Sequence, residues 1–236
     1  MDDPRQHLIV ALDLPSAADA QKVVAAVGDS AFCYKVGMQL FTAEGPRIVR
    51  DLISSGRRVF LDLKYHDIPN TVAAAVREAA RLGISMLTVH ASGGAKMLHA
   101  ASEAARSSNP HLMILAVTVL TSLTEEDLET TGVHGRVQDQ VLRLAGLALE
   151  NGCQGVVASA QEAAELRRKF GDEFVVVTPG VRLAGSAQHD QARVVTPAEA
   201  IAAGASHIVV GRPITGAADP RAEARGILAQ ISGVKI

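Results

Sequence analysis

The chain contains few aromatic residues: phenylalanine and tyrosine make up 3% of its 236 residues, and tryptophan is absent. Proteins that bind single-stranded nucleic acid stack bases on aromatic side chains, and nonspecific binders carry a positive charge. The formal net charge here is −2 at pH 7. The composition therefore argues against a nucleic-acid partner.

Long hydrophobic runs and cysteine motifs are also missing. No apolar run approaches the roughly 20 residues that a membrane-spanning helix needs, and the first residues, MDDPR, are polar and acidic, unlike a signal peptide. The two cysteines, Cys33 and Cys153, lie far apart and have no CxxC partner. We expect buried thiols without a disulfide or metal role, in a cytoplasmic protein that has no membrane partner.

Apolar residues make up 48% of the chain, which is enough for a sizeable core. Short runs rich in Val, Ile and Leu recur, and their lack of strict alternation is typical of buried parallel strands. Ala-rich amphipathic stretches lie between them. The runs predict strands at 8–13, 32–37, 58–64, 85–91, 113–120, 155–159, 174–180 and 207–213. The stretches predict helices at 16–27, 42–55, 69–82, 94–107, 137–150, 160–170, 196–203 and 220–231.

Eight strand-then-helix units predict an α/β fold, a (β/α)8 TIM barrel, in which residues 1–236 form a single domain. A doubly wound open sheet is the alternative, but it usually has fewer strands and a glycine-rich first turn, which is absent here. The longest irregular segment, 181–194, follows the seventh strand, and a loop of that length is usually a functional lid. A second irregular segment, 121–136, follows the fifth strand.

Charged residues gather at the end of the third predicted strand, in the segment FLDLKYHDIPNT at 60–71. Alternate side chains of an extended strand point the same way, so Asp62 and Lys64 should share a face. Asp67 follows, just before a proline that can start a helix. Charges beside an apolar run are costly unless they are paired, so the spacing fits a structural ion pair as well as a catalytic cleft.

Polar residues also end the other predicted strands, and barrel active sites lie at that edge. The seventh and eighth strands lead into TPGVR and GRP. In each motif a glycine lets backbone N–H groups approach an anion, and an arginine supplies a charged guanidinium that can donate two hydrogen bonds to it. The two motifs predict a site for a phosphorylated substrate, with Gln191 folding over the anion. Each residue alone also has a structural explanation; His90, for example, suits a hydrogen-bonded packing role better than a ligand role. The polar residues at strand ends are Asp13, Lys35, Asp62, Lys64, His90, Thr121, Ser122, Arg182, Gly211 and Arg212.

Taken together and in this order along the chain, these motifs resemble those of the orotidine 5′-monophosphate decarboxylase family in its bacterial form, from about residue 8 to residue 220. The resemblance implies that the chain converts orotidine 5′-monophosphate (OMP) to UMP, the last step of UMP synthesis, without a metal or an organic cofactor. It also implies a homodimer with its active sites at the subunit interface. The shared motifs are ALD at 11–13, YKVG at 34–37, FLDLKYHDIPNT at 60–71, VHASGG at 89–94, VTVLTS at 117–122, VTPGVR at 177–182, DQAR at 190–193 and VGRPIT at 210–215.

The family pattern also implies a role for each matching residue. Lys64 would protonate C6 of the pyrimidine after CO2 leaves, and Asp62 would lie beside the departing carboxylate. Lys35 and Asp67 would complete an alternating Lys–Asp–Lys–Asp array, with Asp67 and Thr71 supplied by the partner subunit. The implied substrate contacts are Asp13 and Lys35 to the ribose, Thr121 and Ser122 to the pyrimidine, and Arg182, Gln191, Gly211 and Arg212 to the 5′-phosphate.

Three alternatives stay open at this point. A magnesium-dependent sugar-phosphate decarboxylase or aldolase on a similar barrel also carries a D-x-K-x-x-D stretch, although Lys35 lies where such enzymes place an acidic residue. A catalytically silent nucleotide-binding barrel would bind UMP without turning over OMP. Schiff-base catalysis by Lys64 would leave an adduct that borohydride traps.

Overall fold

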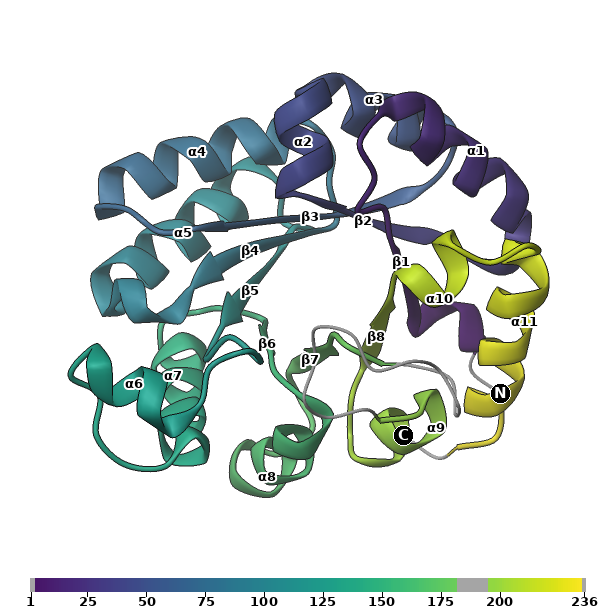
Figure 1. Ribbon diagram of the computed structural model, residues 1–236. Coiled ribbons are helices and arrows are strands. Elements are labelled where there is room, and N and C mark those ends of the chain that lie inside the picture. The colour runs from purple at the N-terminus through teal and green to yellow at the C-terminus, as the bar shows by residue number, and fades with distance from the viewer. Residues whose placement is uncertain (1–2, 182–194, 235–236) are drawn as a thin grey trace.

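The computed structural model describes residues 3–181 and 195–234, and its centre is a closed barrel of parallel strands (Figure 1). Each strand pairs with the next in chain order, and the last pairs with the first. This topology confirms the predicted (β/α)8 barrel and excludes the open sheet. The strands are β1 (Leu8–Ala11), β2 (Cys33–Gly37), β3 (Arg58–Tyr65), β4 (Met86–His90), β5 (Met113–Val117), β6 (Gly155–Val157), β7 (Val175–Thr178) and β8 (His207–Val210).

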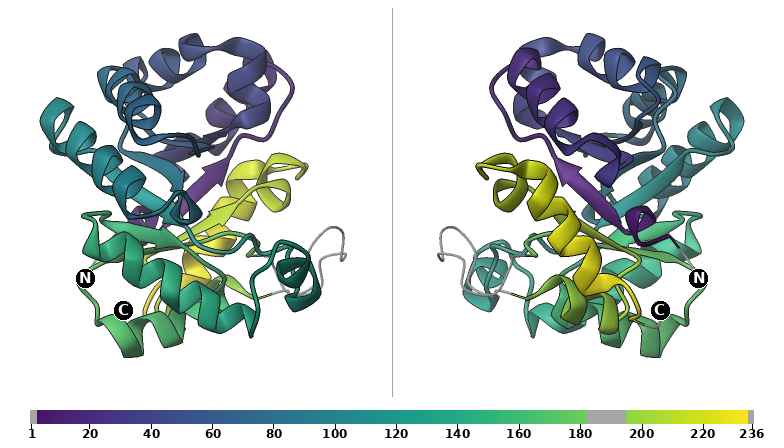
Figure 2. Two further views of the ribbon diagram at one scale, coloured as in Figure 1. Left: turned by 90° about the vertical axis from the view of Figure 1, so that its left-hand side faces the viewer. Right: turned by 90° about the vertical axis from the view of Figure 1, so that its right-hand side faces the viewer.

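Helices surround the barrel on all sides, as the two turned views in Figure 2 show. Three of them, α7, α8 and α11, have the bounds that the sequence predicts. In the described part of the chain, no helix is long and apolar enough to cross a membrane. The helices are α1 (Ala17–Val27), α2 (Met38–Glu44), α3 (Pro46–Ser54), α4 (Pro69–Arg81), α5 (Ala95–Ser108), α6 (Glu125–Thr130), α7 (Val137–Glu150), α8 (Ala160–Phe170), α9 (Pro197–Ala202), α10 (Arg212–Thr215) and α11 (Pro220–Ile231), with short 3-10 turns η1 (Pro4–Gln6), η2 (Gly28–Ser30) and η3 (Ala91–Gly93).

Most predicted elements differ from the structure by one to three residues at their ends, and two differences have a clear local cause. The helix expected at 42–55 begins earlier and is divided into α2 and α3 at Gly45, whose φ of 63° is a left-handed conformation that suits glycine. The eighth strand ends at Val210, because the following residues form α10. In both places, local backbone conformation decides where an element of the structure ends.

Side-chain caps fix where several helices begin. Ser16 and Thr196 accept hydrogen bonds from backbone N–H groups of the first turns of α1 and α9, as expected for N-caps. Thr124 and Asp127 form the same kind of cap reciprocally at the start of α6. That cap places a short helix within 121–136, which the sequence analysis had taken as irregular.

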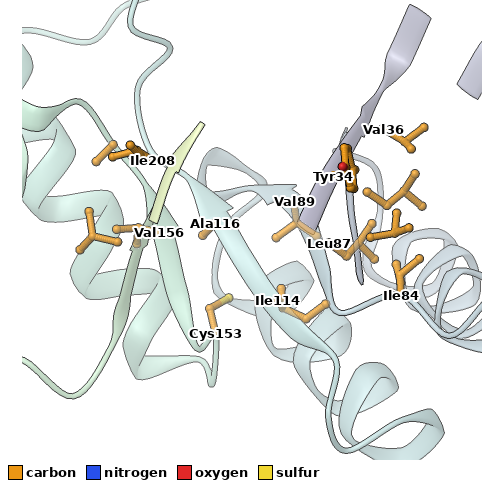
Figure 3. Packing of buried hydrophobic residues seen from close by; sticks show 14 of the residues in the cluster. Tyr34, Val36, Ile84, Leu87, Val89, Ile114, Ala116, Cys153, Val156 and Ile208 are labelled. Carbon is orange, nitrogen blue, oxygen red and sulfur yellow. The ribbon is translucent and has the colours of Figure 1, made fainter. Parts of the chain in front are cut away.

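Alternating strand residues fill two separate cores. Residues such as Tyr34, Leu87 and Ile114 pack between the strands and the surrounding helices, in the large core shown in Figure 3. The other strand face points into the barrel, because successive side chains of a strand face opposite ways. The side chains of this inner core are Ile9, Ala11, Cys33, Phe60, Met86, Leu115, Val177 and Val209.

Both cysteines are free and buried, as the sequence predicts. Burial raises the pKa of Cys33 to about 12 and the pKa of Cys153 to about 11. Each thiol is therefore protonated at neutral pH and behaves as a small apolar side chain.

Candidate active site

Two lysines and two aspartates form a continuous chain of ion pairs where β1, β2 and β3 end. The Nζ atom of Lys35 lies 2.7 Å from Oδ1 of Asp13 and 3.5 Å from Oδ2 of Asp62. The Nζ atom of Lys64 lies 2.8 Å from Oδ1 of Asp62. The charges therefore alternate from Asp13 through Lys35 and Asp62 to Lys64, a set that we call the ion-pair array.

The centre of the array is shielded from solvent. The side chains of Lys35 and Asp62 are 12% and 13% exposed, whereas that of Asp13 is 57% exposed. Burial by itself would raise the pKa of Asp62, but the charges of Lys35 and Lys64 and two hydrogen bonds outweigh it and hold that pKa below its ordinary value. Asp62 is therefore ionised at neutral pH and forms an ion pair with each ammonium group.

Strand β3 is irregular at the point where it carries the array. Leu61 pairs with Leu87 and Tyr65 pairs with Val89, so three residues of β3 lie opposite one residue of β4. With two extra residues on β3, this register shift is a bulge larger than the usual two-against-one kind, and such irregularities re-aim side chains. The regular alternation that the sequence analysis assumed for Asp62 and Lys64 therefore does not hold, although the two side chains do meet.

The backbone of Lys64 is itself unusual. Its φ is 51°, and across residues 3–181 and 195–234 no other residue except glycine has a positive φ. This region is sparsely populated for side chains other than glycine and asparagine, and it persists only where the surroundings hold it. Such strain at a charged residue is typical of functional sites.

Thr88, the residue of β4 opposite the bulge, is a contributor that the sequence analysis missed. Its Oγ1 accepts a hydrogen bond from the backbone N–H of Lys64 at 2.9 Å and donates one to Oδ1 of Asp62 at 3.0 Å. The residue is completely buried. Threonine is a common strand residue, so nothing in the sequence around it marks a special position.

Gly37 is a second contributor that the sequence analysis missed. A Cβ atom at this position would lie 2.8 Å from Oδ1 of Asp13 and 2.9 Å from Nζ of Lys35. Its backbone, with φ −91° and ψ −179°, is open to any residue, so the requirement is one of space. The motif YKVG contains the glycine, but only the fold shows which atoms fill the space above it.

Asp67 and Thr71 lie outside the array. Both are exposed, and Oδ1 of Asp67 accepts a hydrogen bond from the backbone N–H of Ile68 at 2.6 Å. Within the described residues, Asp67 forms no ion pair with Lys35 or Lys64. In the single chain, Asp13 completes the ion-pair array, and Asp67, which the sequence led us to expect in it, lies outside.

His90 ends β4 next to this region. Its ring centroid lies 5.5 Å from that of His66, and burial, the charge of His66 and the charge of Lys64 lower its pKa. The half-buried imidazole is therefore neutral at pH 7. In the described part of the chain, the His90 side chain makes this ring contact. The hydrogen-bonded packing role expected from the sequence stays a prediction.

A cavity of about 470 Å³ opens at the same end of the barrel, over β5, β6 and β7. Thr121, Ser122 and Gly180 line it, which places the two residues expected to bind the pyrimidine on a recessed surface. Ser159 and Thr178 also belong to its lining, but their hydroxyl oxygens are buried. With the exposed residues Thr121 and Ser122 in its lining, the cavity offers hydroxyl groups to a bound molecule.

The expected phosphate residues fall into two groups. Gly211 lies at the N-terminus of α10 and Arg212 is its first residue, with an exposed side chain at the end of β8. Arg182 and Gln191 lie outside the described residues, as does most of the segment expected to form a lid. Their placement at a phosphate stays a prediction from the sequence.

The array also bears on the metal-dependent alternative. In the described ranges, no group of three or more His, Cys, Asp or Glu side chains is placed to hold a metal ion. The ammonium of Lys35 contacts both Asp13 and Asp62, the two carboxylates of the array. A fixed ammonium between two carboxylates disfavours a divalent cation at the same point.

Comparison with known proteins gives consistent matches. The family model described as "Orotidine 5'-phosphate decarboxylase / HUMPS family" matches residues 6–227. The chain is 53% identical to the orotidine 5′-phosphate decarboxylase of Moorella thermoacetica, over 98% of this chain and 94% of that protein. It is also 53% identical to the enzyme of the same name from Halorhodospira halophila, over 96% of each chain.

A solved structure extends the likeness to three dimensions. The crystal structure of orotidine 5′-phosphate decarboxylase from Lactobacillus acidophilus is 39% identical and superposes with a TM-score of 0.87. The match covers 97% of this chain and all of that chain. The similarity therefore includes the whole barrel and the strand ends that carry the array.

Proposed function

This chain belongs to the orotidine 5′-phosphate decarboxylase / HUMPS family, and we propose that it decarboxylates OMP to UMP in pyrimidine synthesis. The observation that carries the proposal is the ion-pair array ending at Lys64. The magnesium-dependent alternative is not favoured, because an ammonium occupies the centre of the carboxylate pair. A catalytically silent barrel has no need for a strained, charged lysine at this place.

The chemistry explains why a fixed ammonium is needed. When CO2 leaves C6, the bonding electron pair stays on C6 in an orbital that the ring π-system cannot delocalise. The enzyme must stabilise this localised charge electrostatically, and preorganised charge does so without reorganisation. In our proposal Lys64 stabilises the developing carbanion and then transfers a proton from Nζ to C6, which gives UMP.

The neighbours of Lys64 hold its ammonium in position for this step. Asp62 pairs with the ammonium at 2.8 Å in a partly dry site and so fixes its position. We assign Asp62 to the place beside the departing carboxylate, and Asp13 and Lys35 to the ribose hydroxyls. Lys35 links these two regions, because its ammonium contacts both carboxylates.

Substrate contacts far from C6 complete the proposal. We assign Thr121 and Ser122, in the cavity lining, to the pyrimidine edge. We assign Arg182, Gln191, Gly211 and Arg212 to the 5′-phosphate. Binding energy from the phosphate can then contribute to the transition state through closure of the loop over the substrate.

A direct assay with a single substitution tests the function. Purified protein should consume OMP, followed by its absorbance, in the presence of EDTA. Lys64→Ala should lower kcat at least about 10²–10³-fold, equivalent to roughly 3–4 kcal/mol of barrier, because one group supplies both charge and proton. Lys22→Ala, at an exposed lysine paired with Asp19, is the matched control and should keep full activity.

The same experiment separates the alternatives. Loss of activity in EDTA would support the metal-dependent reaction, and UMP binding without turnover would support the silent barrel. Trapping of Lys64 by borohydride in the presence of OMP would support a Schiff base. More than a tenth of wild-type kcat in Lys64→Ala would contradict the assigned role of this residue.

We also propose that the enzyme is a homodimer in which Asp67 and Thr71 enter the partner's active site. Two observations support this arrangement. Asp67 is exposed and makes no ion pair with the array in the described part of its own chain. Two large apolar side chains close to the same strand ends, Met38 and Ile68, are 55% and 66% exposed, as expected for residues that a second subunit covers.

Mixing two inactive variants tests the shared site. Lys64→Ala and Asp67→Ala should each be inactive as homodimers. If Asp67 acts in the partner's site, a mixed dimer has one site with both lesions and one with neither. Random exchange then restores about a quarter of wild-type activity, within the limits set by coupling between these residues. No recovery, once subunit exchange is confirmed independently, would refute the shared site.

Two coarser features complete the proposal. We propose one domain over residues 1–236, because α11 packs against α1 and joins the two ends of the described chain. We propose a cytoplasmic location, because both cysteines are free and buried, as is usual in a reducing compartment.

A further inference from the structure

We propose that Thr88 is a positioning residue for the decarboxylation, whose hydroxyl fixes the direction of Lys64 by holding both the bulged backbone and the carboxylate of Asp62. The inference rests on the proposed function. Thr88 contacts the ammonium of Lys64 only indirectly, through Asp62 and the Lys64 backbone, so it affects the position of that ammonium.

The bulge creates the need for such a residue. In a regular parallel pair, the N–H of a β3 residue donates to a backbone carbonyl of β4. Asp62, Leu63 and Lys64 together face Thr88 alone, so the ladder cannot supply a carbonyl for each of them. The hydroxyl of Thr88 replaces the missing carbonyl and accepts from the N–H of Lys64 at 2.9 Å.

The direction of the hydroxyl proton follows from this contact. A hydroxyl has one proton to donate, and an ionised carboxylate only accepts. The proton of Thr88 therefore points to Oδ1 of Asp62 at 3.0 Å. The same oxygen receives Nζ of Lys64 at 2.8 Å, so the backbone and the ammonium of Lys64 are both tied to Asp62 through a closed ring of contacts.

The ring opposes the strain at Lys64. A lysine with φ 51° relaxes toward more populated conformations unless its surroundings prevent it. Thr88 is completely buried, so water cannot take over its two hydrogen bonds without entering the core. Removal of the hydroxyl should therefore let the bulge shift and move Nζ away from its place over C6.

An isosteric substitution tests the hydroxyl alone. Thr88→Val keeps the shape and removes both hydrogen bonds, and displacement of a reacting group by about 1 Å costs up to about 10²-fold in rate. We expect kcat for OMP to fall about 10- to 100-fold in Thr88→Val, while the Kd of UMP changes less than about threefold. Thr88→Ser keeps the hydroxyl and should restore kcat to within about threefold of wild type.

A pH profile gives a second readout, which general loosening of the barrel would not change in the same way. Thr88 donates one of the hydrogen bonds that favour the ionised form of Asp62. Its loss should raise the pKa of Asp62 and move the acid limb of the kcat profile to higher pH in Thr88→Val, but not in Thr88→Ser.

Ser206→Ala is the matched control. The hydroxyl of Ser206 also accepts from a backbone N–H, that of Val176 at 3.0 Å, but it precedes β8 at the opposite end of the barrel. Its loss should leave kcat and the pH profile unchanged. If Thr88→Val does not fold, Thr88→Ser and Thr88→Cys carry the test, and the weakly bonding thiol should give a kcat about tenfold lower.

Several results would overturn the inference. One is a folded Thr88→Val protein with wild-type kcat, and another is a Thr88→Ser protein as impaired as the valine variant. Equal kcat values for the serine and cysteine variants would also contradict it. So would a loss of kcat in Ser206→Ala equal to the loss in Thr88→Val. Wild-type protein is assayed in parallel. Absence of OMP turnover by wild type would refute the proposed function, whereas an active wild type with an equally active Thr88→Val would refute only the role of Thr88.

Discussion

Replacing Gly37 by alanine should separate the activity of this protein from its stability. The backbone at this position has φ −91° and ψ −179°, a conformation that alanine adopts without strain. Replacement of glycine by alanine at such a site stabilises a protein by roughly 0.4–1 kcal/mol, because the unfolded chain loses freedom. On backbone grounds alone, Gly37→Ala should unfold at the wild-type temperature or slightly above it.

The methyl group, however, enters space that the array occupies. It would lie 2.8 Å from Oδ1 of Asp13 and 2.9 Å from Nζ of Lys35. Each atom must retreat by at least about half an ångström to reach ordinary van der Waals contact. Both atoms end flexible side chains, so the fold tolerates the shift, but the 2.7 Å pair between them and the 3.5 Å contact of Lys35 with Asp62 both change.

The expected result is a fall of about 10- to 100-fold in kcat/KM for OMP, because small displacements of a preorganised group cost this much. Gly226→Ala is the control: it lies in α11, and its new methyl meets nothing within 4 Å. That change should add about 1 kcal/mol of stability, equivalent to about 2–4 °C in Tm, without loss of activity. A Gly37→Ala protein with kcat/KM within about twofold of wild type would refute the reasoning.

Two further predictions concern the phosphate and the thiols. Arg182→Ala should weaken the binding of OMP and barely affect the binding of the phosphate-free nucleoside, because Arg182 lies in TPGVR after β7. Inhibition constants for UMP and uridine measure this difference. Equal losses of affinity for the two would contradict the assignment of Arg182 to the phosphate site. Cys33 and Cys153, with pKa values raised by burial to about 12 and about 11, should resist iodoacetamide at pH 8 in the native protein and react after unfolding; mass spectrometry measures the labelling, and rapid native labelling of either thiol would contradict its burial.

The barrel could be predicted from the sequence because its signals are local and repeated. Val-, Ile- and Leu-rich runs indicate buried strands, proline begins several of the helices between them, and glycine ends several others. What escaped prediction is short or depends on one backbone angle. Helix α6 rests on the reciprocal cap of Thr124 and Asp127, and the division of α2 from α3 rests on the conformation of Gly45.

The site was predictable where strand ends alone determine it. Asp13, Lys35, Asp62 and Lys64 each lie within two residues of the end of a predicted strand, and parallel strands of a barrel bring those ends to one edge. Thr88 and Gly37 could not be identified in this way, because their roles depend on atoms of neighbouring strands. The register shift of β3 against β4 is likewise a property of the pair, which neither strand shows alone.

The coupling within the array limits what the removal of any one charge can measure. Asp62 contacts both ammonium groups, so its loss leaves Lys35 and Lys64 as two partly buried like charges without their shared partner. The resulting change in rate combines altered charge, altered protonation and altered position, and such effects do not add. Thr88→Val and Gly37→Ala change no charge and affect different members of the array: the first removes a hydroxyl that contacts Asp62 and Lys64, and the second adds a methyl group beside Asp13 and Lys35. If both lower kcat while UMP still binds, placement of the ammonium must itself account for part of the catalysis, because each variant keeps every charged group that the mechanism requires.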